Sequence, residues 1–261
     1  MFITLKQKLI LFVIFILVLS ISSCSHYYYM PNIQHVPLFI EKNEFRFSAS
    51  KGIGVGEKKN LVNTEANVAY SMTKNLAFMT NFSYAYFGDK SYSANYSSDY
   101  YLELASGYYK PFYSHVVFEI YGGFGNGNQH HKYELGAADF KFTKIFIQPS
   151  VGFTFNALDI AFSKRISNLN FYKVEQSGGD RYGYESYNID MIRKNKNSFL
   201  NETALTTRLG WKKIKLQIQI QLSNNLSEPV LRFVDAVISF GVWFTITDRY
   251  SRDAYKKKDM R

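Results

Sequence analysis

Adjacent histidines are the most obvious candidates for chemistry in this sequence. His130 and His131 could bind a metal ion or transfer protons, because imidazole titrates near neutral pH and is a common metal ligand. Consecutive side chains point to opposite faces of a strand, so the two rings would not converge on one ion there. The surrounding residues, NGNQHHKYELGAAD, predict an exposed loop. A solvated pair is the favoured interpretation.

Ser114 and His115 form the second candidate, since a hydroxyl activated by an imidazole is a common nucleophile of hydrolases. Neighbouring side chains do not easily hydrogen-bond across the faces of a strand, and no Asp or Glu is matched to this pair. A lipid-modifying hydrolase is therefore a minor alternative, and we expect the protein not to be an enzyme.

Cofactor and nucleic-acid sites have little support in the composition. Five Pro and one Cys in 261 residues exclude a disulfide scaffold and a zinc site built on cysteines. The stretch Gly52–Gly56 lacks the spacing of a phosphate-binding loop and precedes no helix. The formal charge of +10 is spread through turns, loops and the C-terminus instead of forming one stripe. We expect no cofactor, no metal and no nucleic acid.

Charged residues of both signs recur opposite apolar positions in strand-like segments. Buried charges must pair, so the favoured interpretation is a structural network inside an enclosed lumen. The alternative is that these residues line a narrow path for ions or small solutes. The candidates for this lumen network are Arg46, Glu65, Glu103, Glu119, Asp159, Arg165 and Arg208.

The stretch IKLQIQIQLS (Ile214–Ser223) alternates aliphatic and polar side chains without interruption. A period of two predicts a strand with two chemically different faces. A soluble protein would bury the aliphatic face, whereas a membrane barrel would turn it toward lipid and enclose Lys215 and the glutamines. In a barrel, Ile218→Arg is expected to cost about 2–4 kcal/mol, and Gln219→Arg much less.

Nine further segments have strand character, and no convincing amphipathic helix is found between them. The connections alternate between short and long, as do the periplasmic turns and external loops of transmembrane barrels. An even number of strands places both termini of the barrel's chain at the periplasmic end. The ten segments are Glu44–Gly52, Thr64–Met72, Leu76–Gly88, Tyr100–Tyr109, His115–Gly125, Phe140–Asn156 (with a bulge or bend expected at Pro149), Leu158–Tyr172, Phe199–Trp211, Ile214–Ser223 and Phe233–Thr247.

Segment length and face chemistry favour a membrane barrel. Tilted transmembrane strands need about nine to eleven residues, whereas soluble strands more often have about five or six. Tyr and Trp gather toward strand ends, as in the aromatic girdles of barrels. We therefore predict an all-β, up-and-down antiparallel transmembrane β-barrel of about ten strands. A soluble lipocalin-like barrel is the rival fold, but its Gly-x-Trp motif would lie in the first strand, whereas Gly241–Trp243 lies in the last.

The first residues read as an export signal. Lys6 and Lys8 precede the apolar run Leu9–Leu19, which is too short for a transmembrane helix of about twenty residues. The following ISSC, ending at Cys24, resembles the lipobox of bacterial lipoproteins, in which the cysteine receives a diacylglycerol before cleavage. The resemblance implies a signal peptide at residues 1–23 and lipidation at Cys24.

Residues 24–43 contain two prolines and no clear periodicity, and we predict an extended periplasmic tether. Residues 44–247 would form the barrel, and residues 248–261 a charged tail. The tether resembles the start of uncharacterised outer-membrane β-barrel proteins of Bacteroidetes, which implies fold and location but no activity. The residues that carry this resemblance are Pro31, Asn32, Gln34, Val36, Pro37, Leu38 and Phe39.

The sequence thus predicts an outer-membrane β-barrel lipoprotein with a structural or interaction role, either presenting surface loops or serving as an accessory subunit of an outer-membrane assembly. Membrane lipid and protein partners at the long loops are the expected partners. The alternating last strand, with Phe240, Val242 and Phe244, resembles the signal read by the barrel-assembly machinery. Ten strands leave little open lumen. A narrow channel for ions or small solutes is the main alternative.

Overall fold

The computed structural model describes residues 27–55, 60–88, 96–112, 115–179, 183–227 and 232–247. The predicted signal peptide, Cys24, Ser114 and the C-terminal tail lie outside these ranges. The description below concerns these ranges.

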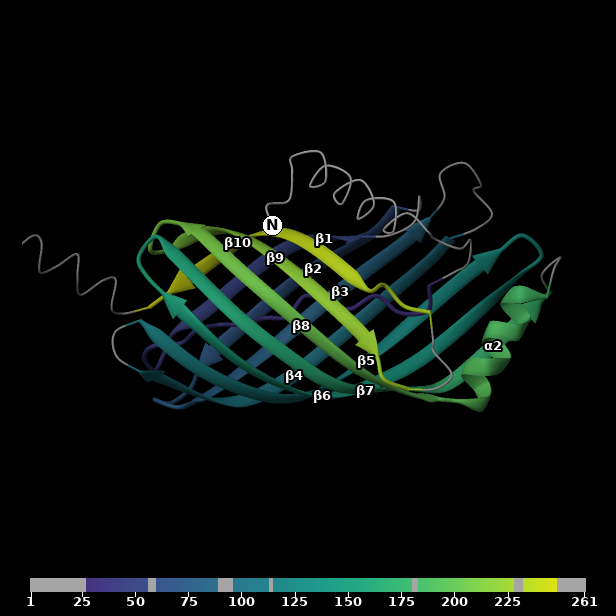
Figure 1. The fold of residues 1–261 in the computed structure, drawn as a ribbon, viewed down its shortest axis with the longest axis horizontal. Coiled ribbons are helices and arrows are strands. Elements are labelled where there is room, and N and C mark those ends of the chain that lie inside the picture. Colours follow the sequence, from purple (N-terminus) through teal and green to yellow (C-terminus); the bar gives the residue numbers. More distant parts are fainter. Residues whose placement is uncertain are drawn as a thin grey trace, which may run out of the picture.

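Ten antiparallel strands form a closed up-and-down barrel, as the sequence predicts (Figure 1). Each strand pairs with its neighbours in sequence, and β1 pairs with β10 to close the ring. Closure removes both sheet edges, so every strand has a hydrogen-bonding neighbour on each side. The strands are β1 (Phe45–Val55), β2 (Asn60–Ser71), β3 (Leu76–Gly88), β4 (Tyr96–Phe112), β5 (Val116–Tyr133), β6 (Gly136–Thr154), β7 (Leu158–Gly178), β8 (Asn197–Gly210), β9 (Ile214–Asn225) and β10 (Ala236–Ile246).

Strand β9 shows which face lies inside. Its aliphatic side chains are exposed on the outer wall, from Ile214 at 44% to Leu216 at 66%, whereas Gln219 and Gln221 are only 1% exposed in the lumen. Phe, Leu, Ile and Tyr side chains form an exposed apolar belt on the other strands as well. A polar interior and an apolar exterior are the arrangement of a barrel surrounded by lipid.

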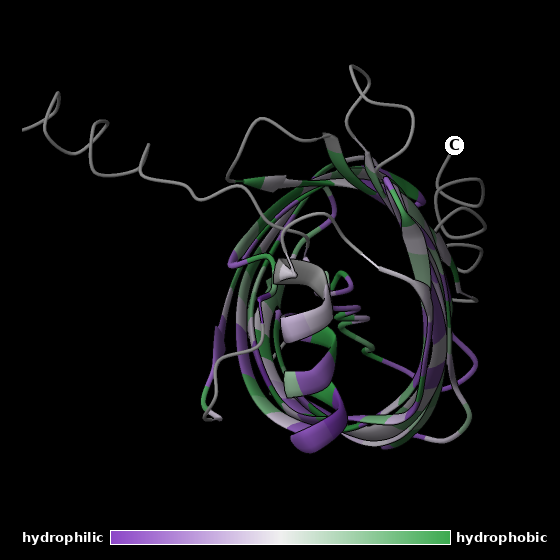
Figure 2. Ribbon diagram, turned by 90° about the vertical axis from the view of Figure 1, so that its right-hand side faces the viewer, coloured by the Kyte–Doolittle hydropathy of each residue, from purple (hydrophilic) through white to green (hydrophobic). Residues whose placement is uncertain are grey.

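The two ends of the barrel differ. One end carries the connections β2–β3, β4–β5, β6–β7 and β8–β9, which are short, and we call it the turn end. The other end carries the remaining connections together with helix α2 (Tyr184–Lys194), and we call it the α2 end. Figure 2 looks into the α2 end, where the helix lies across the opening.

The wall is much higher on one side of the α2 end than on the other. Strands β5, β6 and β7 have 18, 19 and 21 residues, whereas β1, β9 and β10 have 11, 12 and 11. In Figure 1 the tips of β6 and β7 extend well past the end of β9. On the extended part, outward-facing residues such as Asn126, Asn128 and Asp139 are polar, and the enclosed side carries an aromatic and aliphatic cluster together with a few buried polar side chains. This chemistry is that of a wall standing in water.

Three local predictions are corrected by the structure. The stretch expected as a loop around His130 is a hairpin, in which β5 and β6 continue to a tight turn at residues 134–135. The register of β6 against β7 shifts at Lys141/Phe142, whereas at Pro149, where a bulge or bend was expected, the pairing skips Gln148 and Pro149 without a change of register. The long connection after β7 contains α2, where the sequence predicted no helix. Within the described ranges no helix is long and apolar enough to cross a membrane.

We predict that Ile218→Arg, at the middle of the apolar face of β9, lowers the free energy of unfolding by about 2–4 kcal/mol, because it places a charge in hydrocarbon. Asn128→Arg is the matched control: it faces outward from β5 above the belt, and its cost should stay within about 0.5 kcal/mol. Urea unfolding in lipid vesicles measures both values. Equal costs would show that the belt does not contact lipid.

Candidate functional site

The lumen is occupied by the chain's own N-terminal segment. Every residue from Tyr28 to Phe39 is buried. The segment, purple in Figure 1, runs from the α2 end to the turn end before the chain enters β1, and Figure 2 shows it inside the ring of strands. We call residues 27–43 the lumen segment. The prediction of a periplasmic tether for residues 24–43 is therefore not what the structure shows, because Tyr28–Phe39 lie inside the barrel and, of the described residues, only Lys42 and Asn43 are exposed.

Aromatic side chains hold the lumen segment at the α2 end. Tyr28 stacks on His131 with ring centroids 5.1 Å apart and meets the edge of Phe140 at 5.7 Å. These rings belong to an apolar cluster inside the extended wall, to which α2 contributes Ile189 and Ile192. The cluster closes the lumen above the membrane belt.

Backbone hydrogen bonds tie the same end of the segment to the β9–β10 connection. The Tyr28 amide donates to the carbonyl of Arg232 at 2.9 Å, and the Val234 amide donates to the carbonyl of Tyr29 at 3.0 Å. At this end the backbone of the segment is thus bound from the low side of the wall, while the Tyr28 ring packs against β5 and β6 of the high side.

Polar side chains of the wall bind the backbone of the segment in the middle of the barrel. The Ile33 amide donates to a carboxylate oxygen of Glu65 at 2.6 Å. The Gln34 amide donates to the carboxamide oxygen of Gln219 at 2.9 Å, and the carboxamide nitrogen of Gln219 donates back to the Gln34 carbonyl at 2.8 Å. Gln219 thus acts toward Gln34 as a neighbouring strand would.

The same pattern continues toward the turn end. Gln148 donates to the His35 carbonyl at 2.8 Å, and Arg208 donates to the Val36 carbonyl at 2.7 Å. Along the barrel the wall thus supplies side-chain acceptors for the segment's amides and side-chain donors for its carbonyls. Gln219→Arg was expected to cost little free energy of unfolding. In the structure Gln219 binds the backbone of Gln34 in a filled lumen, so a small cost is no longer expected.

At the turn end the segment is held by further carboxylate, guanidinium and hydroxyl contacts. The Phe39 amide donates to Glu119 at 3.1 Å. Arg46 donates to the carbonyl of Leu38 at 3.4 Å, and Tyr109 donates to the carbonyl of Glu41 at 3.0 Å.

A bidentate ion pair inside the lumen joins Arg165 and Glu103. Two guanidinium nitrogens of Arg165 each lie 3.1 Å from a carboxylate oxygen of Glu103, and both side chains are almost fully buried. Arg165 also donates to Gln148 and to Asn32 of the lumen segment. A buried charge is tolerated when its donors and acceptors are all engaged.

Two further sets of charged side chains lie in the lumen. Lys144 donates to Tyr29 at 2.6 Å and lies 3.3 Å from Glu202. Closer to the turn end, Asp159 accepts from Lys215 at 2.6 Å and lies 3.9 Å from Arg208.

The structure places all seven residues of the predicted lumen network in the lumen, but it does not join them into one network. Arg165 pairs with Glu103, Arg208 lies near Asp159, and Arg46 pairs with Glu44. Glu65 and Glu119 instead accept backbone N–H groups of the lumen segment. Glu44, Lys144 and Glu202 are lumen charges that the sequence pattern did not single out, whereas Lys215 was expected in the lumen but not as a member of the network. Lys144 shares its strand face with Gln148, and Glu202 with Arg208, so strand alternation could have identified both.

Among the described residues, the candidate histidines are not assembled into a catalytic site. His131 points into the lumen, where its ring nitrogen lies 2.9 Å from Ser97, whereas His130 faces outward and lies 2.7 Å from Asp139. His115 contacts the carbonyl of Thr154. Among the described residues, no group of three or more His, Cys, Asp or Glu side chains could hold a metal ion.

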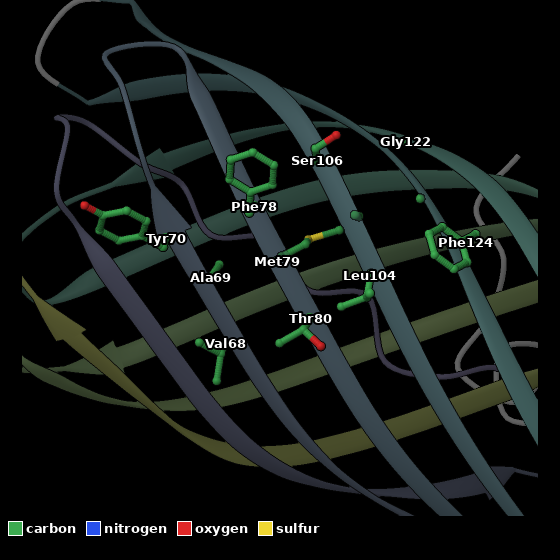
Figure 3. A pocket seen from close by; sticks show the side chains of 12 residues that line it. Val68, Ala69, Tyr70, Phe78, Met79, Thr80, Leu104, Ser106, Gly122 and Phe124 are labelled. Atoms are coloured by element: carbon green, nitrogen blue, oxygen red, sulfur yellow. The ribbon is translucent and has the colours of Figure 1, made fainter.

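A hollow of about 490 Å³ lies on the outer wall across β2 to β5 (Figure 3). Its floor is low because Ser106 and Gly122, which pair directly across β4 and β5, carry almost no side-chain bulk. Tyr70, Phe78 and Phe124 stand around it. The hollow is part of the apolar belt, and none of its lining residues is charged.

No protein-family model matches the chain, and no curated protein matches it in sequence. Solved structures with a similar course of the chain include the translocator domain of the autotransporter NalP from Neisseria meningitidis, with 7% identity, a TM-score of 0.46 and coverage of 78% of this chain and 88% of that one. An outer membrane channel from Pseudomonas putida F1 has 9% identity, a TM-score of 0.40 and coverage of 82% and 100%. The outer membrane enzyme PagL has 11% identity, a TM-score of 0.31 and coverage of 77% and 98%. Because these TM-scores are below 0.5, the fold of this chain is assigned from its own strand pairing.

We predict that Arg165→Met lowers the free energy of unfolding by about 3–5 kcal/mol, because it leaves Glu103 charged and buried without its cation. The double variant with Glu103→Gln should lose less than the sum of the two single variants. Arg193→Met, which breaks the exposed Arg193–Asp190 pair on α2, is the control and should cost less than about 1 kcal/mol. Additive costs in the double variant would show that the two buried side chains are not coupled.

Proposed function

We propose that the protein is a closed outer-membrane β-barrel lipoprotein with a structural or interaction role. The observation that carries this proposal is the occupied lumen: the segment from Tyr28 to Phe39 is buried along its whole length and bound by side chains of the wall. A barrel filled in this way is suited to holding its outer surfaces in place and not to passing solutes.

The location follows from the chemistry of the two faces. An exposed apolar belt around a closed barrel with a charged lumen is stable in a bilayer, because no unpaired strand edge meets lipid. The export signal and the short turns at one end favour the outer membrane with the α2 end toward the exterior.

The extended wall of β5, β6 and β7, together with α2, is the surface that we propose for interaction. Its outer side carries polar and charged residues of both signs, including Asp139, Lys141 and Lys173, and it projects beyond the apolar belt. A rigid projection with this composition suits contact with another protein at the cell surface. We further propose that the barrel-assembly machinery is a partner during biogenesis.

The alternatives receive less support from the arrangement of residues. A narrow channel would require the lumen segment to leave, together with the side chains that it engages. A hydrolase would require a nucleophile, a base and an orienting carboxylate within hydrogen-bonding distance. His115, the described member of the candidate pair, instead contacts a backbone carbonyl.

Planar-bilayer recording tests the closed barrel. The wild-type protein, with insertion verified by flotation and a heat-modifiable gel band, should give no single-channel steps, because its lumen is filled. A variant in which residues 28–39 are replaced by a Gly/Ser stretch of equal length should give discrete steps, since it lacks the side chains that fill the lumen.

The wild-type recording decides the question even where the variant folds poorly. Regular single-channel steps from the inserted wild-type protein would contradict a closed scaffold and favour the narrow-channel alternative.

Lipidation at Cys24 is a separate part of the proposal. Cells fed labelled palmitate should yield a labelled wild-type protein, and Cys24→Ser should abolish the label, because the thiol that accepts the diacylglycerol is lost. Ser25→Ala is the matched control and should keep the label. Equal labelling of the wild type and Cys24→Ser would exclude acylation at this position.

A further inference from the structure

We propose that the lumen segment carries the amino-terminal end of the mature chain through the barrel to the exterior, so that the lipid on Cys24 enters the outer leaflet beside the low side of the wall. This inference rests on the proposed location and lipidation. It replaces the periplasmic anchor that the strand count alone would suggest.

The direction of the lumen segment supports this route. Its later end is at the turn end, where the Asn43 amide donates to the carbonyl of Ser71 and the chain enters β1. Its earlier end is at the α2 end, where Tyr28 and Tyr29 are bound to the β9–β10 connection. The chain that precedes Tyr27 is therefore attached to the lumen segment at the α2 end.

The short length of chain between Cys24 and Tyr27 limits where the lipid on Cys24 can lie. Two residues, Ser25 and His26, separate Cys24 from Tyr27, and the three residue steps between them span at most about 11 Å when fully extended. The stretch from Tyr28 to Phe39 crosses a distance on the order of 40 Å if extended. Cys24 is thus too close to Tyr27 to return to the turn end.

The place where the lumen segment ends also supports this route. The β9–β10 connection, which binds Tyr28 and Tyr29, lies on the low side of the barrel, where β1, β9 and β10 are short. The high side, formed by β5 to β7, is on a different part of the ring. Lipid is therefore closest to the exit point on the low side, within reach of acyl chains attached at Cys24.

The contacts along the segment make this route stable. At successive levels its amides donate to Glu65 and Glu119, and its carbonyls accept from Gln219, Gln148 and Arg208. Movement by one residue along the barrel would break all of them together. The segment is thus held in a single register, which keeps its outer end at the α2 end.

Labelling of single cysteines on intact cells tests the proposal. Ser25→Cys reports the amino-terminal end, Gly179→Cys reports the α2 end, and Lys213→Cys reports the turn end. A membrane-impermeant maleimide should label Ser25→Cys and Gly179→Cys on intact cells to the same extent as after permeabilisation. Lys213→Cys should be labelled only after permeabilisation. The parent protein, whose only cysteine is Cys24, sets the background.

The result that would overturn the inference is Ser25→Cys behaving like Lys213→Cys, or being labelled only after denaturation. Reversal of Gly179→Cys and Lys213→Cys would instead contradict the proposed orientation in the membrane, and the pairing of Ser25→Cys with Gly179→Cys would still decide the route of the chain. Strong labelling of the parent protein on intact cells would contradict lipidation but would place Cys24 at the exterior.

Discussion

The backbone of an enclosed, extended segment must find hydrogen-bond partners, and much of the lumen can be explained by this requirement. Residues 28–39 lie inside a wall whose strands are already paired with one another, so most of the segment has no neighbouring strand. An unpaired amide or carbonyl in such a place costs about as much as a lost hydrogen bond. Glutamine, glutamate and arginine side chains supply the missing partners, and Gln219 supplies both a donor and an acceptor.

The same requirement explains why charges can lie so deep in the barrel. Arg165 is fully buried, yet its guanidinium group bonds Glu103, Gln148 and Asn32 at once. Asn32 belongs to the lumen segment, so the segment supplies a hydrogen-bond acceptor for a buried charge of the wall. The wall in turn supplies hydrogen-bond partners for the backbone of the segment. Above the belt the enclosed side chains become aromatic and aliphatic, because there the outer face meets water and the interior can be an ordinary apolar core.

Strand alternation was sufficient to predict the ten strands and the inward face, because lipid requires an uninterrupted apolar row outside. It failed around residues 126–133, where the outward residues are polar and the inward row contains glycines. A Cβ on Gly125 would meet Tyr101 at 2.2 Å and one on Gly127 would meet Phe142 at 2.3 Å, so these positions leave room for rings. Both faces therefore lacked an apolar row, and the strand resembled a loop.

The lumen segment was misplaced for a related reason. A chain enclosed on all sides has no single apolar face, so Ile33 and Gln34 are equally buried and no period appears. The seven charged lumen residues could be chosen from their strand faces, but their partners depend on which strands meet across the ring and on a segment that the alternation does not describe.

The position of the lumen segment relative to the closing seam links occupancy of the lumen to formation of the barrel. Its later end continues into β1, and its earlier end is bound by residues just before β10, so both strands of the β1–β10 seam are attached to it. If β1 and β10 paired around an empty lumen, Glu65, Glu119 and Gln219 would be enclosed without the backbone groups that they bind. Enclosing polar groups without partners is costly, whereas closing the seam with the segment in place satisfies both sides. The segment therefore stabilises the closed barrel in the way that a core stabilises a soluble domain.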